Sequence, residues 1–89
     1  MIFLQLTFFQ SDEKVNLSVT ILANEIGTMD TQHETKAFGT IIRRVGGTDW
    51  HRVRERPIDI VRMIREGEKH EGSTLIRWDR EKQQPVVDE

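Results

Sequence analysis

The fold is decided by residues 38 to 56, FGTIIRRVGGTDWHRVRER, which combine the clearest turn signal in the chain with its densest positive charge. Two runs rich in β-branched residues, 39 to 45 and 50 to 56, flank Gly46-Gly47-Thr48-Asp49. A Gly-Gly pair supplies the positive φ angles that a tight connection between antiparallel strands requires. The stretch therefore predicts a β-hairpin.

The second strand of this hairpin carries its arginines in a row. Side chains alternate between the two faces of a strand, so the even-numbered residues from 50 to 56, one Trp and three Arg, share one face. Guanidinium groups bind phosphates and carboxylates bidentately, and an indole ring stacks on a nucleotide base. The candidate ligand-binding residues are therefore Arg43, Arg44, Trp50, His51, Arg52, Arg54 and Arg56.

Charge is unevenly distributed along the chain. Residues 43 to 65 contain seven arginines and three acids, a net charge of +4, whereas the remainder contains six basic and twelve acidic residues, a net charge of −6. Such segregation favours a site for a phosphate or carboxylate group. A plain solvated surface is the alternative, because exposed strands and helices also carry charge.

The composition is that of one small globular domain of 89 residues, 36% of them apolar. The absence of cysteine excludes a disulfide framework and a thiolate metal site, and it favours a reducing cytoplasm. No apolar run reaches the roughly 20 residues that span a bilayer. We expect a soluble cytoplasmic protein without cofactor, metal or membrane contact.

The remaining segments predict an α+β fold in which a small antiparallel sheet of four or five strands carries one amphipathic helix on one face. Residues 2 to 9 and 15 to 21 alternate as two paired strands, whereas residues 22 to 29 fit a strand, a helical turn or a bend at Gly27. Residues 30 to 36 are polar and predict a loop.

The C-terminal part of the chain begins with an amphipathic helix. Pro57 fits its first position, Asp59 favours the helix dipole, and Gly67 is expected to end the helix after residue 66. Residues 73 to 78 predict a last short strand. The domain therefore covers residues 1 to 78, and residues 79 to 89 are expected to form a mobile tail.

The order of these elements resembles that of the FlbD/SwrD-like family of short flagellar-operon proteins and related small bacterial or phage proteins. Their pattern is an opening strand, an apolar segment, T-x-I-x-x-x-x-G, an extended V-x-E and a helix rich in Ile and Val. Over about residues 2 to 66 this chain places Thr40, Ile42, Gly47, Val53 and Glu55 near those positions, followed by PIDIVRMI. The resemblance implies a non-enzymatic module that binds a partner; the flagellar role is not carried over.

Two functions follow from the arginine row. The first is capture of a phosphate-bearing ligand such as a nucleotide, with Trp50 as the stacking surface; long duplex nucleic acid is disfavoured because the acidic remainder repels it. The second is a protein-interaction module or inhibitor that binds an acidic partner protein.

An enzyme and a monomer are both disfavoured. His51 and Glu55 lie four residues apart on one predicted strand, about 13 Å at ~3.3 Å per residue, which is too far for a direct hydrogen bond. No catalytic or metal motif stands out elsewhere, and His33 in its polar loop lacks a second ligand.

Phe3 and Phe9 lie opposite the apolar face of the first strand, so we expect a homo-oligomer that covers them.

Overall fold

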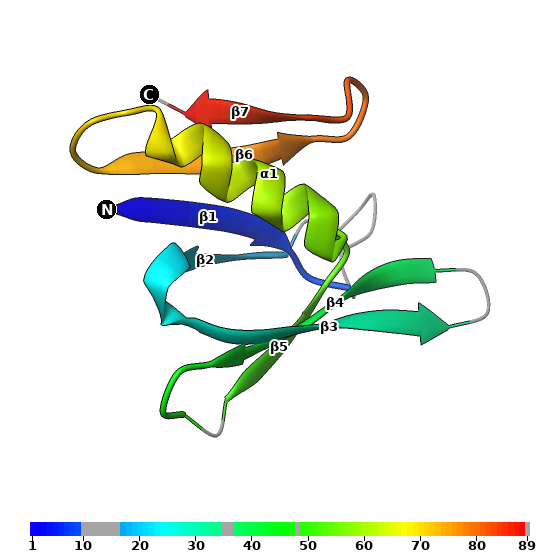
Figure 1. Ribbon diagram of the computed structural model, residues 1–89. Helices are drawn as coiled ribbons and strands as arrows, with labels where there is room; N and C mark the ends of the chain where they lie inside the picture. Colours follow the sequence, from blue (N-terminus) through cyan, green and yellow to red (C-terminus); the bar gives the residue numbers. More distant parts are fainter. Residues whose placement is uncertain (10–16, 35–36, 48, 89) are drawn as a thin grey trace.

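The structure is a computed structural model that describes residues 1–9, 17–34, 37–47 and 49–88 (Figure 1). One helix, one short 3₁₀ turn and seven strands make up these segments. In chain order they are β1 (Ile2–Thr7), β2 (Ser18–Leu22), η1 (Ala23–Glu25), β3 (Ile26–Glu34), β4 (Ala37–Arg44), β5 (Trp50–Val53), α1 (Pro57–Glu68), β6 (Thr74–Asp79) and β7 (Gln84–Asp88).

The strands form two sheets, and the α+β class is confirmed. Four strands are ordered β2-β1-β6-β7, with β1 antiparallel to β2 but parallel to β6, and β7 antiparallel to β6. The other three strands form an antiparallel sheet, β3-β4-β5. Helix α1 packs against β1, β6 and β7, and Figure 1 shows it lying across one face of the four-stranded sheet.

One core joins the helix and both sheets. In β1 the period of two buries Leu4 and Leu6, and the apolar stripe of α1 contributes Ile60 and Met63. The fully buried apolar side chains of the other described elements are Ile21, Ile42, Val53 and Ile76. No helix in the described part of the chain is long and apolar enough to cross a membrane.

The predicted hairpin is confirmed as the pair β4–β5. Thr40 pairs with Val53 and Arg43 with Trp50, and Gly46 in the turn has a φ of 68°. The second strand is shorter than expected, because β5 ends at Val53 and residues 54 and 55 bend toward α1. The even-numbered residues from 50 to 56 therefore do not form one continuous row on a strand.

The N-terminal prediction is confirmed for the first two strands and needs one correction, at residues 30–34. The first two strands pair as expected over residues 3–7 and 18–22, whereas residues 10 to 16 lie outside the described part. The undecided segment 22–29 forms the 3₁₀ turn and then enters β3, whose register shifts between Ile26 and Thr28. The loop expected at 30–36 is wrong for residues 30–34, which continue β3 because β4 supplies their backbone partners.

The predicted helix is confirmed, but its last residue and the structure of the segment after β6 differ from the prediction. α1 continues to Glu68, and Gly67 lies inside it facing β1, where a Cβ atom would come within 2.7 Å of Ile2 Cγ2. Gly67 thus permits close packing and does not end the helix. The expected strand 73–78 is present as β6, and residues 84–88 form β7 on its edge, so the tail expected from residue 79 is wrong there.

Candidate functional site

The structure separates the seven candidate residues into three places. Arg43 and Arg44 lie at the turn end of the hairpin, each about 3.8 Å from one acid, Asp30 and Glu25 respectively. Both pairs are partly exposed to solvent, and exposed pairs contribute little to stability. Arg43 pairs with Trp50 across the β4–β5 ladder, but neither arginine makes a cation–π contact within the described residues.

Trp50, His51 and Arg52 form the second group, around a shallow hollow of about 430 Å³ that Phe8 and Leu17 also line. The Trp50 side chain is 56% exposed. Arg52 lies with its guanidinium 4.8 Å from the ring centre of Phe9, and the rings of His51 and Phe8 are 6.1 Å apart. The aromatic partner of Arg52 is therefore Phe9.

Arg54 and Arg56 form the third group and meet residues from the other end of the chain. They line a hollow of about 530 Å³ between the exit of the hairpin, the start of α1 and the β6–β7 turn. We call it the arginine hollow; its lining residues are Phe9, Arg54, Glu55, Arg56, Asp59, Trp78, Arg80 and Gln83. Three arginines and two aromatic rings thus face one space.

Arg54 is held where the chain leaves β5. Its backbone N–H donates to the carbonyl of Thr7 at 2.9 Å, which fixes this residue against the end of β1. Its Nε and Nη2 donate to the carbonyl of Phe9 at 3.4 and 3.3 Å. A guanidinium has five N–H donors, so these contacts leave several for a ligand.

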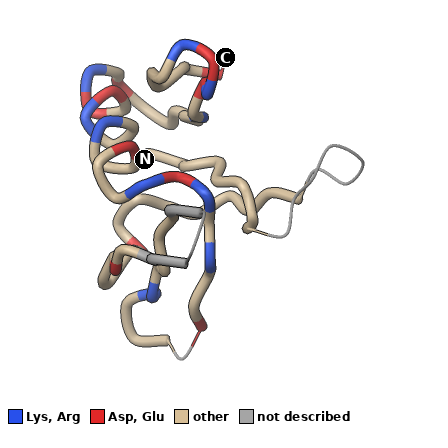
Figure 2. The backbone as a smooth tube through the Cα atoms, turned by 90° about the vertical axis from the view of Figure 1, so that its right-hand side faces the viewer, with Lys and Arg blue, Asp and Glu red and all other residues tan. Residues whose placement is uncertain are grey.

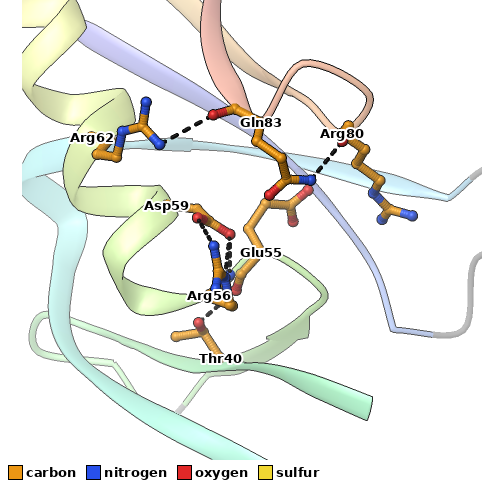
Figure 3. Close-up of polar contacts among 7 residues, drawn as sticks. All are labelled: Thr40, Glu55, Arg56, Asp59, Arg62, Arg80 and Gln83. Carbon is orange, nitrogen blue, oxygen red and sulfur yellow. Dashed lines mark hydrogen bonds and ion pairs between the residues drawn. The ribbon is translucent and has the colours of Figure 1, made fainter. Parts of the chain in front are cut away.

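Arg56 and Asp59 close the N-terminus of α1. Asp59 is buried and accepts hydrogen bonds from the backbone N–H of Arg56 at 3.1 Å and from its Nε and Nη2 at 3.1 and 3.0 Å. Figure 3 shows the two side chains facing each other at the helix start. The hydrogen bond and the charge of Asp59 raise the pKa of Arg56, so Arg56 stays a cation whose charge Asp59 already balances.

Glu55 is the second acid of the arginine hollow and is only 4% exposed. Its Oε1 accepts from the backbone N–H of Thr7 at 2.8 Å, and its own backbone carbonyl accepts from Thr40 Oγ1 at 2.6 Å. These two bonds connect β1 of one sheet with β4 of the other. Glu55 therefore has a structural task in addition to its position in the hollow.

The β6–β7 turn presents Arg80. Asp79 Oδ1 accepts from the backbone N–H groups of Glu81 and Lys82 at 3.0 and 3.2 Å, which shapes a tight turn. Gln83 ends the turn with a φ of 53°, and its side-chain amide donates to the Arg80 carbonyl. The exposed Arg80 is thereby held beside the hollow by its backbone (Figure 3).

Trp78 and Arg62 connect the turn to the helix. The guanidinium of Arg62 lies 5.2 Å from the ring centre of Trp78, a cation–π arrangement. Arg62 Nη1 also donates to the carbonyl of Gln83 at 3.1 Å, as Figure 3 shows. The half-buried Trp78 therefore lines the hollow while Arg62 contacts its ring.

The arginine hollow suits an anion. Each of its two acids already has a hydrogen-bonding partner, whereas Arg54 and Arg80 make no ion pair with a carboxylate within the described residues. The described residues also contain no cluster of three or more His, Asp or Glu side chains that would hold a metal ion. A ligand here would meet guanidinium groups and aromatic rings.

The sequence analysis selected Arg54 and Arg56, which line the hollow, but as part of a row on one strand face with Trp50. It missed Trp78, Arg80, Gln83 and the neighbouring Arg62. Three of these lie in or beside the segment that was expected to be a tail. A signal was present: the polar stretch 79–84, followed by the apolar pair Val86-Val87, is typical of a second hairpin. With that hairpin, the second tryptophan would have been a candidate.

Comparisons with protein-family models, curated proteins and solved structures find no match to this chain.

Proposed function

We propose that this protein is a small, non-enzymatic binding module that holds a phosphate-bearing ligand, such as a nucleotide, in the arginine hollow. The observation that carries the proposal is the meeting of Arg54, Arg80 and Trp78 around one space of about 530 Å³. Small-molecule sites typically occupy about 300–1,000 Å³ and combine apolar walls with a few convergent polar groups.

Each group has a distinct task in this proposal. Arg54 and Arg80 bind phosphate oxygens through charge-assisted hydrogen bonds, because their guanidinium groups make no ion pair with a carboxylate of the described residues. Trp78 and Phe9 offer apolar surface to the base or sugar. Arg56 serves mainly to hold the helix start, since Asp59 takes up its charge. The stacking residue of the sequence-based hypothesis, Trp50, lies outside this group.

Calorimetric titration tests the proposal directly. The panel contains inorganic phosphate and purine and pyrimidine nucleoside mono-, di- and triphosphates. We expect Arg54→Ala and Arg80→Ala each to cost about 1.5–3 kcal/mol of binding free energy, the range of hydrogen bonds to charged groups. Arg54→Lys should lose most of this energy as well, because an ammonium cannot reproduce the fork.

The matched control is Arg43→Ala, which removes an arginine of the same hairpin that lies beside Asp30 and outside the hollow. It should leave the affinity within about twofold, since it removes only a distant, screened charge. If no member of the panel gives heat or raises the melting temperature at millimolar concentration, the proposal fails.

A second function is favoured by the exposure of Trp50. Trp50 and Val45 are 56% and 65% exposed, and Leu17, which shares a shallow hollow with Trp50, is 43% exposed. An aromatic beside arginines is the composition of an interface hot spot, which suits an acidic partner protein. For this second function we expect Trp50→Ala to abolish capture of the partner in a pull-down, whereas Arg80→Ala should leave it intact.

We also propose that the protein self-associates through one face of strand β1. Phe3 pairs with Leu22 on one side and Leu75 on the other, on the face of β1 opposite the buried Leu4, and all three are half-buried. A second copy would cover this face, and sedimentation at high micromolar concentration measures whether it does.

We also propose that the protein lies in the cytoplasm of a bacterium or phage-infected cell, because it contains no cysteine and resembles the small FlbD/SwrD-like proteins.

A further inference from the structure

A second group of cations continues the arginine hollow along the outer side of helix α1. It borders another hollow of about 580 Å³, which we call the helix hollow; its lining residues are Arg62, Arg65, Glu66, Lys69, Gln84 and Pro85. Spacings of three and four residues place the three cations on one side of the helix. Figure 2 shows positive residues recurring along the helix and again where the chain enters it.

The two hollows are neighbours. Arg62 lines the helix hollow and donates to the carbonyl of Gln83, which lines the arginine hollow. The turn that carries Arg80 also leads directly into Gln84 and Pro85. A ligand that leaves the arginine hollow past Gln83 therefore meets Arg62 first and the other two helix cations next.

The two hollows differ in what they offer a ligand. The arginine hollow has two aromatic rings beside its guanidinium groups, whereas no aromatic residue is among the described residues that line the helix hollow. In the helix hollow the Glu66 carboxylate forms an ion pair with Lys69, with Oε2 3.0 Å from Nζ. Arg65, by contrast, makes no ion pair within the described residues. The first hollow therefore fits a base with its phosphate, and the second fits further phosphates alone.

We infer that the ligand is a linear chain of linked phosphates, a single-stranded oligonucleotide, with one base in the arginine hollow and the following phosphates along the helix hollow. This inference rests on the proposed function of the first hollow. A single strand suits the site because its backbone follows a groove while its bases stay separate. The chain's net charge of −2 limits the contact to a few phosphates, since acids elsewhere repel a longer polyanion.

The test compares ligands of increasing length by calorimetry: thymidine monophosphate and single-stranded oligothymidylates of two, four and eight nucleotides. We expect the affinity per site to rise at least tenfold from one to four nucleotides and then to level off. The double variant Arg65→Ala/Lys69→Ala should lose that gain and leave the monophosphate within twofold. Its control, Arg43→Ala/Arg77→Ala, removes two exposed arginines that line neither hollow and should keep the gain.

Salt dependence gives a second readout. For single strands the logarithm of the binding constant falls with the logarithm of salt concentration by about 0.7 per phosphate neutralised. The helix double variant should therefore reduce this slope by about 0.7 to 1.4 for the four-nucleotide ligand, because Lys69 already faces Glu66 and contributes at most one further phosphate contact beside Arg65. The control pair should leave the slope unchanged.

The outcomes separate the two proposals. A monophosphate that binds without any gain in affinity for longer strands overturns the oligonucleotide and leaves the nucleotide site standing. A monophosphate that does not bind, together with oligonucleotides that do not bind, removes the site itself. If inorganic polyphosphate of matched length binds as tightly as the oligonucleotide, the ligand is not a nucleic acid and the inference is overturned. If a blunt-ended duplex binds more tightly than the single strand, the single-stranded form of the ligand is overturned.

Discussion

Replacing Glu55 by glutamine separates the two tasks of this buried acid. The glutamine amide would keep a carbonyl oxygen in place for the 2.8 Å hydrogen bond from Thr7 N–H, but the substitution removes one negative charge from the lining of the arginine hollow. Hydrogen bonds to charged groups contribute about 1.5–3 kcal/mol and neutral ones about 0.5–1.5, so we expect unfolding free energy to fall by roughly 1 kcal/mol.

Anion binding should change in the opposite direction. At a separation of roughly 8 Å and an effective dielectric constant of about 20, a unit negative charge repels a bound phosphate charge by about 2 kcal/mol. Screening over a Debye length of about 8 Å at physiological salt reduces this to somewhat under 1 kcal/mol. Glu55→Gln should therefore bind a nucleoside diphosphate at least threefold more tightly, and the gain should grow as salt is lowered.

Urea denaturation and calorimetric titration on one protein preparation measure both effects. The matched control is Glu71→Gln, the same chemical change at an exposed residue beyond the helix that lines neither hollow; it should alter neither quantity appreciably. The reasoning is refuted if Glu55→Gln weakens nucleotide binding while the protein remains folded, or if Glu71→Gln strengthens binding as much.

Three further predictions concern the fold, and urea denaturation measures each. Gly39→Ala should destabilise by about 1–3 kcal/mol, because its Cβ would overlap the backbone of strand β5, whereas Gly47→Ala meets nothing closer than 3.7 Å and should change stability little; equal effects would contradict the packing of β4 on β5. Met63→Ala should cost about 2–5 kcal/mol, since this side chain is fully buried, and the 56% exposed Ile58 should tolerate alanine within about 0.5 kcal/mol. Ending the chain after residue 83 removes β7 and its contribution to the core, Val87, and should lower stability by at least ~2 kcal/mol; an unchanged midpoint would mean that these residues are a tail after all.

The parts of the fold that the sequence predicted correctly have local causes. Gly46, the one residue of the Gly-Gly pair with a positive φ, sets the hairpin turn, and Pro57 with Asp59 sets the start of the helix; each acts within a few residues. The burial pattern of β1 is also predictable locally, because alternation along the strand places Leu4 and Leu6 on the same face, and that face is the buried one.

The parts that were missed depend on distant partners. Residues 30–34 are polar because β3 lies at the edge of its sheet, and their extended form comes from pairing with β4. Gly67 was predicted to end the helix, but this position is a glycine because Ile2 packs closely against it. Ile2 lies 65 residues away along the chain, so the local sequence does not reveal this contact. The parallel pairing of β1 with β6 joins residues more than 70 positions apart and leaves no local signature. The polar stretch 79–84 before Val86-Val87 did indicate a hairpin for β7, but it lacks a turn signal as clear as Gly46-Gly47.

The candidate site was half predictable for the same reason. Charge density drew attention to residues 52 to 56, but the prediction placed them all on one strand, and β5 ends at Val53. Once the chain bends toward Pro57, Arg54 and Arg56 face a different set of neighbours from Trp50 and Arg52. The tryptophan that accompanies them, Trp78, comes from β6 and becomes a neighbour only through the sheet.

The most direct measurement of the central claim uses the two tryptophans of the chain. In a ¹H–¹⁵N correlation spectrum each indole N–H gives one signal, and Trp78→Phe and Trp50→Phe assign them. On titration with a nucleoside diphosphate we predict that the Trp78 signal shifts with the binding isotherm, because its ring lines the arginine hollow, while the Trp50 signal stays in place. A shift of the Trp50 signal with an unmoved Trp78 signal would contradict the location of the site, and two unmoved signals at saturating ligand would contradict the site itself.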